Sequence, residues 1–346
     1  MIFAIILLVL LAFSLFGNFS SLVSNVVYSK GGRHMRTVGP RLEEVITEDN
    51  EATEKIAIVE VSGIITSHSF DQGGYGMVEL IKAQLKRAED DAKVRAVILK
   101  VDSPGGEVLA SDEIYRALAD FQKDTRKPVV AAMGNLAASG GYYISAPCQW
   151  IVANELTITG SIGVILHSWN YRGLMNKVGL RPETYKSGKH KDMLSGERDP
   201  DEDHPEEREM VQALIDETYG RFTNVVAKGR ALAHEKNQKY SEADQGRALN
   251  RNWTEYADGR VLSGSEAFKL GFVDQKGNFD DAVKRAQKLA NISSANLIEF
   301  QQRYDFSDLF RLFGKSESRV VKLDLGVEGP KLQAGQLYFL SPTFAH

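Results

Sequence analysis

Short apolar runs alternate, through the central part of the chain, with longer segments whose apolar residues recur at helical spacing. The runs Ile56–Val61, Ala96–Val101 and Val129–Met133 are predicted strands, and Met77–Ala88 and Glu113–Phe121 are predicted helices. Parallel neighbouring strands need a long crossover between them, and helices of this length supply it as β-α-β units. The pattern therefore predicts an α/β fold with a largely parallel sheet.

The same pattern continues to about residue 300, and the tail beyond it has its own apolar runs. Further strands are predicted at Trp150–Ala153, Ile162–Leu166, Glu183–Tyr185 and Phe272–Asp274, and further helices at Gly140–Ser145, Tyr171–Val178, Glu206–Ala231, Gly264–Leu270 and Phe279–Leu289. Residues 187–205 are polar and rich in turn formers, which predicts a loop, and the acidic stretch 197–209 has no predicted role beyond solvation. The tail 301–346 contains runs such as Leu337–Leu340 that cannot bury themselves alone, so it is expected to pack on the body or on a neighbouring subunit.

The N-terminal end differs in character from the rest. Residues 1–29 carry no charged side chain, and a helix of this length can cross a hydrocarbon core about 30 Å thick, so we predict a transmembrane anchor. A cleaved signal peptide is the alternative, but a basic leading region and a clear cleavage site are missing. Lys30 and Arg33 follow the apolar segment, and the positive-inside rule would then keep the rest of the chain in the cytoplasm. Residues 30–54 are polar and acidic, which predicts a linker.

Composition narrows the possible classes of function. The 346 residues carry a net charge of −4 and no stripe of lysine and arginine, which argues against nucleic-acid binding. The single cysteine, Cys148, excludes an intramolecular disulfide and lies in an apolar context typical of a core residue. The seven histidines are scattered without metal-ligand spacing. We therefore expect no metal and no other cofactor.

The candidate chemistry centres on Ala137–Tyr143, which follows a predicted strand. A turn and then small residues predict a strand that feeds a helix across a tight bend. Ser139 would lie near the helix N-terminus, where free N–H groups favour developing negative charge, and Gly140 and Gly141 would let a substrate backbone approach. Two observations weaken this hypothesis: such a serine is often only a helix cap, and Ala137 breaks the Gly-x-Ser-x-Gly pattern.

A second loop, Asp102–Gly106, follows the strand Ala96–Val101. Loops at the carboxyl ends of neighbouring parallel strands gather at one edge of a sheet, so this loop and the Ser139 turn are expected to be neighbours. Paired glycines present unobstructed backbone N–H groups, as an oxyanion hole requires. Taken alone the loop is equally well a Pro-Gly turn, but the two loops together indicate acyl-transfer chemistry.

A nucleophilic serine needs a base. His167, after the predicted strand Ile162–Leu166, is one candidate, although a histidine at a strand end commonly faces solvent. The other candidates are Lys186, Lys189 and Lys191. A lysine acts as a base only when its pKa falls from about 10.4 toward about 7 to 8, which requires an apolar surrounding. In so polar a loop, bound substrate or a second subunit must supply that surrounding.

Four blocks, in a fixed order, carry a resemblance to a known family. They are Ala138-Ser-Gly-Gly-Tyr-Tyr-Ile, Thr159-Gly-Ser-Ile-Gly-Val, Lys186-Ser-Gly with His190-Lys-Asp, and Asp258-Gly-Arg-Val, with Asp102-Ser-Pro-Gly-Gly upstream. From about residue 56 to 300 the chain resembles signal peptide peptidase A, in its short, single-unit form. The resemblance implies a Clp protease/crotonase-like fold, a repeated β-β-α superhelix. It also implies a membrane-bound serine protease with a Ser/Lys dyad that degrades signal peptides left in the membrane.

The resemblance assigns roles to individual residues. Ser139 matches the nucleophile, and Lys191 matches the general base of the short form. Ser161 would hydrogen-bond the amine of the base and orient it. The N–H groups of Gly106 and Gly140 would form the oxyanion hole.

Two alternative bases stay open under the same resemblance. Lys186 resembles the lysine used by the long, tandem form of the family, and His167 would serve a Clp-type protease that pairs Ser139 with a histidine and an acidic partner. Two further readings involve no protease: a crotonase-like acyl-CoA enzyme, in which Ser139 only starts a helix, and a membrane-anchored scaffold without turnover.

The resemblance also implies partners and a location. Family members form dome-shaped homo-oligomeric rings in which the serine and the lysine can come from neighbouring chains, and this would bury Lys191. Their substrates are membrane-embedded signal peptides and apolar unfolded peptides. Their catalytic domain lies outside the cytoplasm, and we follow the family here against the charge rule. The expected order is an anchor at 1–29 in the cell (inner) membrane, a linker at 30–54, a protease domain at 55–300 and a tail at 301–346.

Overall fold

The structure, a computed structural model, describes residues 39–68, 75–199, 204–302 and 337–340. Apart from Gly39, these belong to one compact unit, Pro40–His346. The anchor predicted at 1–29 lies outside the described residues. Within the described ranges, no helix is both long enough and apolar enough to cross a membrane.

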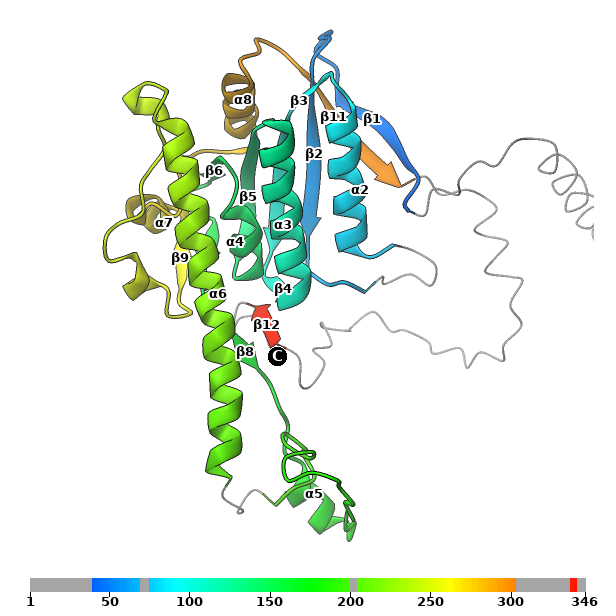
Figure 1. The fold of residues 1–346 in the computed structure, drawn as a ribbon. Helices are drawn as coiled ribbons and strands as arrows, with labels where there is room; N and C mark the ends of the chain where they lie inside the picture. Colours follow the sequence, from blue (N-terminus) through cyan, green and yellow to red (C-terminus); the bar gives the residue numbers. More distant parts are fainter. Residues whose placement is uncertain (1–38, 69–74, 200–203, 303–336, 341–346) are drawn as a thin grey trace, which may run out of the picture. The chain divides into compact units, whose positions relative to one another are not determined.

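A mainly parallel sheet forms the centre of this unit (Figure 1). Its strands are β1 Leu42–Glu48, β2 Lys55–Ser62, β3 Val94–Ser103, β5 Val129–Ala138, β6 Trp150–Ala153, β7 Ile158–Gly160, β9 Val261–Ser263, β10 Gln275–Lys276 and β11 Asn296–Gln302. The order is β1-β11-β2-β3-β5-β6-β10, with β7 paired to β5 and β9 to β7. Pairing is parallel from β11 to β10, and β1 is antiparallel to β11. The predicted α/β class with a largely parallel sheet is confirmed.

Helices cover both faces of the sheet. They are α2 Met77–Asp90, α3 Val108–Thr125, α4 Gly140–Ser145, α5 Arg172–Lys177, α6 Pro205–Asn237, α7 Gly264–Leu270 and α8 Phe279–Ala290, with short 3-10 turns η1 Glu242–Asp244 and η2 Trp253–Tyr256. Successive strand residues point to opposite faces, so Val59 and Leu99 pack with α2 and α3, whereas Ile58 and Ile98 pack with α8. The sheet therefore has an apolar layer on each face.

A small second sheet lies beyond the carboxyl end of β3. Its strands are β4 Gly105–Glu107, β8 Ile165–Leu166 and β12 Leu337–Leu340, with β12 in the middle and antiparallel to both neighbours. The side chain of Phe339 in β12 is fully buried in the main core. The apolar run at 337–340 thus packs on the body of the same chain.

Four local predictions differ from the structure. Within the predicted linker, residues 42–48 form β1, because hydrogen bonds to β11 stabilise this edge strand although none of its side chains is buried. No strand forms at Glu183–Tyr185, where Tyr185 is 91% exposed and so has no apolar layer to pack on. The predicted strand Ile162–Leu166 is replaced by β7 before it and β8 at its end. Residues Phe272–Asp274 precede the strand β10 instead of forming it.

A buried ion pair fixes the C-terminal half of α6 to the sheet. Arg230 in α6 pairs with Asp274 just before β10, and both side chains are at most 2% exposed. Arg230 Nη1 also donates to Cys148 O at 3.0 Å, and Asp274 Oδ2 accepts the N–H of Ile151 in β6 at 2.8 Å. The pair therefore joins α6, β6 and the start of β10 at one corner of the fold.

Replacing Asp274 should cost far more stability than replacing an exposed carboxylate. Asp274→Asn leaves the Arg230 charge buried without its counter-ion, and we expect a loss of about 3–5 kcal/mol in the free energy of unfolding. The control is Glu155→Gln, which removes an exposed, solvent-screened pair with Lys276 and should cost much less. Urea denaturation measures both variants, and equal losses would contradict the role given to the buried pair.

Candidate functional site

Ser139 lies at the turn between β5 and α4 in an unusual backbone conformation. Its φ and ψ are 54° and −116°, a region that L residues rarely occupy. The turn is held because Ser139 N donates to Gly160 O at 2.8 Å and Ser139 O accepts from Tyr143 N at 2.8 Å. The side chain is 1% exposed, and within the described part of the chain its Oγ has no hydrogen-bond partner. A buried hydroxyl held without a partner is typical of a functional group.

The glycine loop lies directly against this turn. A Cβ placed on Gly140 would be 3.0 Å from Gly105 Cα and 3.1 Å from Gly106 N, closer than ordinary packing allows. Ser103 at the end of β3 pairs with Ala137 in β5, so the two loops leave neighbouring strands. The backbone nitrogens of Gly106 and Gly140 therefore lie in the same small region, next to the N-terminus of α4. Two N–H donors in that arrangement can stabilise a negative oxygen.

β12 lies beside these glycines, in the space between β4 and β8 that we call the groove. Phe339 lies opposite Gly106 in the ladder, and Leu340 lies opposite Gly105. A Cβ on Gly105 would be 1.9 Å from Phe339 O and 2.7 Å from Gly140 N. The carbonyl oxygen of Phe339 and the backbone nitrogen of Gly140 therefore both lie against Gly105. An extended segment is thus held on both sides, by β4 and by β8, with one of its carbonyls next to the turn that carries Ser139.

The side chain of Phe339 enters an aromatic pocket. Its ring stacks on Tyr143, with centroids 4.8 Å apart, and lies 4.6 Å from the ring of Phe222 in α6. Tyr143 is fully buried, and its hydroxyl donates to Asp112 Oδ1 at 2.6 Å. Burial and this hydrogen bond raise the pKa of Tyr143, so the phenol stays neutral and remains a donor. Asp112 is fixed in turn by Arg221 Nη2 at 2.9 Å.

Ser161, predicted to orient the base, and His167, an alternative base, lie in different environments. Ser161 follows β7 directly, is 3% exposed and donates its N–H to Arg260 O at 2.7 Å. Because Gly160 O accepts the N–H of Ser139, Ser161 lies next to the turn that carries Ser139. His167 is exposed after β8. None of these side chains hydrogen-bonds Ser139 Oγ among the described residues.

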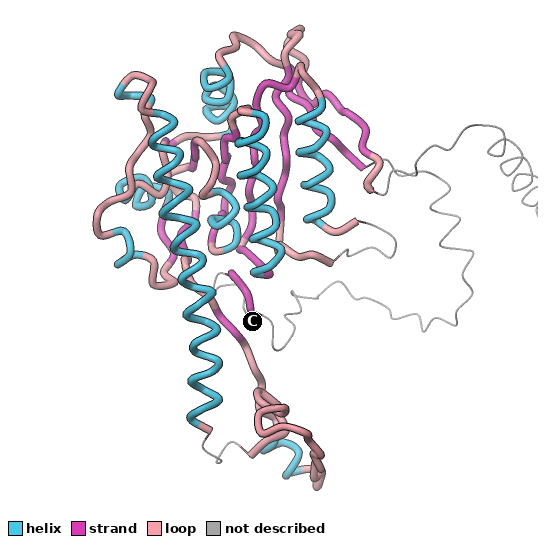
Figure 2. The backbone as a smooth tube through the Cα atoms, in the orientation of Figure 1, coloured by secondary structure: helices cyan, strands magenta, loops and turns pink. Residues whose placement is uncertain are grey.

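The two candidate lysines lie in a part of the chain that we call the arm, residues 167–199 and 204–221. The arm consists mostly of turns, with the short α5 and the first half of α6 (Figure 2). Figure 1 shows α5 and the first turns of α6 well away from α4. Lys186 Nζ donates to both carboxylate oxygens of Asp192, at 2.8 and 2.9 Å, whereas Lys191 is exposed. Among the described residues, neither lysine hydrogen-bonds Ser139 Oγ.

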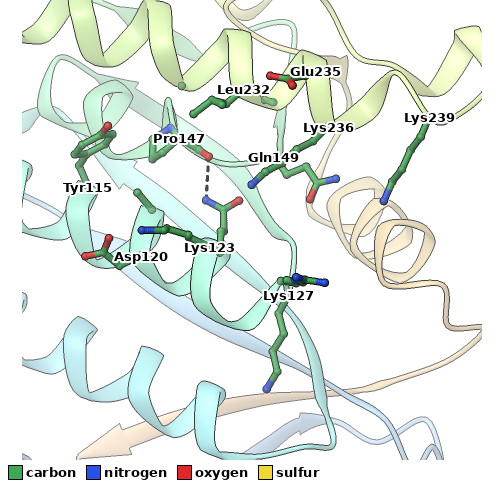
Figure 3. A pocket seen from close by; sticks show the side chains of 15 residues that line it. Tyr115, Asp120, Lys123, Lys127, Pro147, Gln149, Leu232, Glu235, Lys236 and Lys239 are labelled. Atoms are coloured by element: carbon green, nitrogen blue, oxygen red, sulfur yellow. Dashed lines mark hydrogen bonds between the residues drawn. The ribbon is translucent and has the colours of Figure 1, made fainter.

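A separate cavity of about 850 Å³ lies between α3 and α6 (Figure 3). Lys123, Lys236 and Lys239 line it, and its wall is fixed where Gln122 Nε2 donates to Pro147 O at 2.9 Å. None of the candidate site residues lines this cavity, so it is distinct from the groove that holds β12. Across the described ranges, no group of three or more His, Cys, Asp or Glu side chains is placed to hold a metal ion.

Sequence reasoning missed the groove and its aromatic pocket. Asp112, Tyr143 and Phe222 come from three helices that have no sequence relation to one another, so no spacing could predict that they meet. The one available signal was the apolar run Leu337–Leu340 near the end of the chain, which predicted packing without indicating where.

Comparison with known proteins shows which proteins this chain resembles. The model of peptidase family S49 matches residues 121–293. An Enterococcus faecium protein named "Putative signal peptide peptidase SppA" is 38% identical over 264 residues, which are 75% of this chain and 71% of that protein. Protease 4 of Haemophilus influenzae is 35% identical over 246 residues, 70% of this chain but 36% of that longer protein. Among solved structures, a mutant of the 1510-N membrane-bound stomatin-specific protease is 16% identical, with a TM-score of 0.42 over 73% of this chain and 100% of that chain.

The backbone at residue 139 gives a direct test of strain. Holding a residue with a side chain at a φ of 54° and a ψ of −116° costs about 1–3 kcal/mol, whereas glycine accepts it at an entropic cost of up to about 1 kcal/mol. We therefore expect Ser139→Gly to be more stable than Ser139→Ala by about 1 kcal/mol. Thermal unfolding of the two variants measures this difference. A less stable Ser139→Gly would show that the turn stores no strain.

Proposed function

Because the chain belongs to peptidase family S49, we propose that it is a membrane-bound serine endopeptidase of the signal peptide peptidase A type, with Ser139 as nucleophile and Lys191 as general base. The observation that carries the proposal is the groove at Ser139. A buried hydroxyl without a partner among the described residues lies in a strained turn, next to the N–H groups of Gly106 and Gly140, where an extended segment of peptide is already seated.

The reaction follows from this arrangement. Lys191 Nζ, in its neutral form, takes the proton of Ser139 as Oγ attacks the peptide carbonyl, and the resulting oxyanion accepts hydrogen bonds from the Gly106 and Gly140 N–H groups. The ammonium of Lys191 then protonates the leaving amine, and the C–N bond breaks to leave an acyl-enzyme. Water, deprotonated by the same lysine, attacks the ester and releases the new carboxylate and the serine hydroxyl.

Lys191 is proposed to come from a neighbouring chain. On the arm it is exposed to solvent, and Figure 1 shows α5 and the first turns of α6, between which its loop runs, well away from α4. Docking of the arm on a second copy would bury the amine, lower its pKa and place it near Ser161, whose hydroxyl would orient it. Lys186 suits the base role less well because Asp192 already holds its amine, whereas His167 is exposed like Lys191 and is an alternative for the substitution series to test. A closed ring of identical chains satisfies every site in this way.

The groove supports a choice of substrate. β12 pairs with β4 and β8, so a substrate is proposed to add as an extended strand, held by main-chain hydrogen bonds. The residue that takes the place of Phe339 would present an apolar side chain to Tyr143 and Phe222. Remnant signal peptides and unfolded apolar peptides have this character. Residues 1–29 are proposed as the membrane anchor, with the catalytic unit, of Clp protease/crotonase-like fold, outside the cytoplasm.

A substitution series with mixed chains tests the dyad and its sharing. Ser139→Ala and Lys191→Ala should each abolish cleavage of an apolar peptide, while Lys186→Ala and His167→Ala should keep most of it. Co-expression of Ser139→Ala with Lys191→Ala chains should restore about a quarter of wild-type turnover, because a serine and a lysine from different intact chains then meet at random. No recovery would place both groups in one chain. An active Lys191→Ala protein would move the base to whichever of the other two variants is silent.

Removing β12 should open the groove. A chain that ends at Gln336 lacks this strand, and we expect its kcat/KM for an apolar peptide to rise about tenfold or more. This is the rise expected if β12 occupies the site about nine-tenths of the time or more in the full chain. The matched control ends at Leu340 and keeps the whole strand. Steady-state kinetics of the two proteins decide, and equal values would mean that β12 does not compete with substrate.

A further inference from the structure

The loop that carries Lys191 is fixed on both sides of that residue. His190, just before it, lies with Nδ1 3.1 Å from Glu207 Oε1 in the first turn of α6. Asp192, just after it, accepts both hydrogen bonds from Lys186 Nζ. Lys191 itself has no ion pair or side-chain hydrogen bond with any residue in the described ranges. The neighbours of Lys191 are therefore held while its own amine is left available.

Glu207 joins these two anchors. Its carboxylate also accepts a hydrogen bond from Arg198 Nη1, and Arg198 Nε lies 3.7 Å from Asp192 Oδ2. The contacts run from His190 through Glu207 and Arg198 to Asp192, and so enclose the backbone at Lys191. We call these four residues the loop clamp. A chain of two hydrogen bonds to a carboxylate and one ion pair restricts the loop more than a single surface pair would.

Glu207 is buried, although most of the other residues in the first half of α6 are exposed. Its side chain is 11% exposed, and it is the one buried residue of α6 among those described before Phe222. A buried carboxylate must keep its partners, because desolvation otherwise disfavours its charge. Here the hydrogen bond from His190 and the charge of Arg198 hold the pKa of Glu207 below its usual range. The hydrogen bond from Lys186 does the same for the pKa of Asp192. Both carboxylates therefore stay ionised at neutral pH.

The cluster fixes the backbone on both sides of Lys191, so its effect on that residue is geometric. A lysine on a loop has four side-chain torsions and reaches a distant serine reproducibly only if its backbone is fixed. The loop clamp fixes the backbone at Lys191 in this way. Lys186 supports the loop clamp, since its amine holds Asp192 instead of reaching toward the proposed nucleophile.

We propose that Glu207 is a positioning residue that acts through His190 and Arg198 to aim Lys191 at the nucleophile of a neighbouring chain. The inference rests on the function proposed for Lys191. Glu207 touches no substrate and exchanges no proton with it. Its loss should therefore lower the rate of the chemical step and leave peptide binding in the β12 groove unchanged.

The variant that tests this is Glu207→Gln, which keeps the shape of the side chain and removes its charge. We expect kcat to fall about 10- to 100-fold, as for a displaced catalytic group, with KM within about twofold of wild type. The rate at which a serine-reactive probe labels Ser139 should fall by the same factor, and Glu207→Asp should restore part of it. The matched control is Glu209→Gln, an exposed residue of the same helix, which should leave kcat unchanged.

Mixed chains separate a positioning role from a structural one. Glu207→Gln should lower turnover when it is placed in the Ser139→Ala chain, which supplies Lys191. It should have no effect in the Lys191→Ala chain, which supplies Ser139. Equal loss in both placements, or a kcat like that of Glu209→Gln, would overturn the inference.

The two proposals fail in different ways. If Lys191→Ala alone keeps full activity, the function proposed for Lys191 fails, whatever Glu207 does. If the mixed chains recover no activity without any change at Glu207, only the sharing of the dyad fails, and kcat of Glu207→Gln in the single chain still decides the role of Glu207. If Lys191→Ala is silent and Glu207→Gln keeps its kcat, the function stands and the loop clamp is only structural.

Discussion

The close approach of two backbone turns is the constraint on which the site depends. Gly140 lies so near the glycine loop that a Cβ on it would be 3.0 Å from Gly105 Cα and 3.1 Å from Gly106 N, and only glycine fits there without a shift of the backbone. That approach brings two N–H groups together and bends the chain at Ser139 into a strained conformation. The parallel sheet makes it possible, because β3 and β5 end side by side and deliver both turns to one edge.

The space between β4 and β8 has the width of one extended strand. β4 and β8 leave a gap of one strand, and β12 fills it with ladder hydrogen bonds on both sides. The pocket for the side chain at Phe339 is built from α4 and α6, and its Tyr143 is fixed by Asp112, which Arg221 holds in turn. Under the proposed function, main-chain pairing would set the direction of a bound peptide, and the rings of Tyr143 and Phe222 would select its side chain.

The long helix α6 connects this groove to the arm. Its second half is fixed to the sheet by the buried Arg230–Asp274 pair and contributes Phe222 to the pocket, while its first turn carries Glu207. A helix of 33 residues spans about 50 Å, so one element reaches from the groove to the arm that carries Lys191. Separating the nucleophile from the proposed base in this way would leave an unassembled chain without a complete dyad.

Much of this could be predicted from the sequence, because it depends on local patterns. Apolar alternation and helical spacing predicted the central strands and helices, and small residues after a strand indicated the Ser139 turn. The polar edge strand β1 was taken for a linker, since hydrogen bonding to β11 leaves no apolar signature, and a strand was wrongly predicted at Glu183–Tyr185. The site residues themselves stay predictions. What only the tertiary structure decided is which distant segments meet: β12 in the groove of β4 and β8, Tyr143 against Phe222, and Glu207 beside the loop of Lys191. Those contacts depend on the path of the chain through space, and sequence spacing does not encode that path.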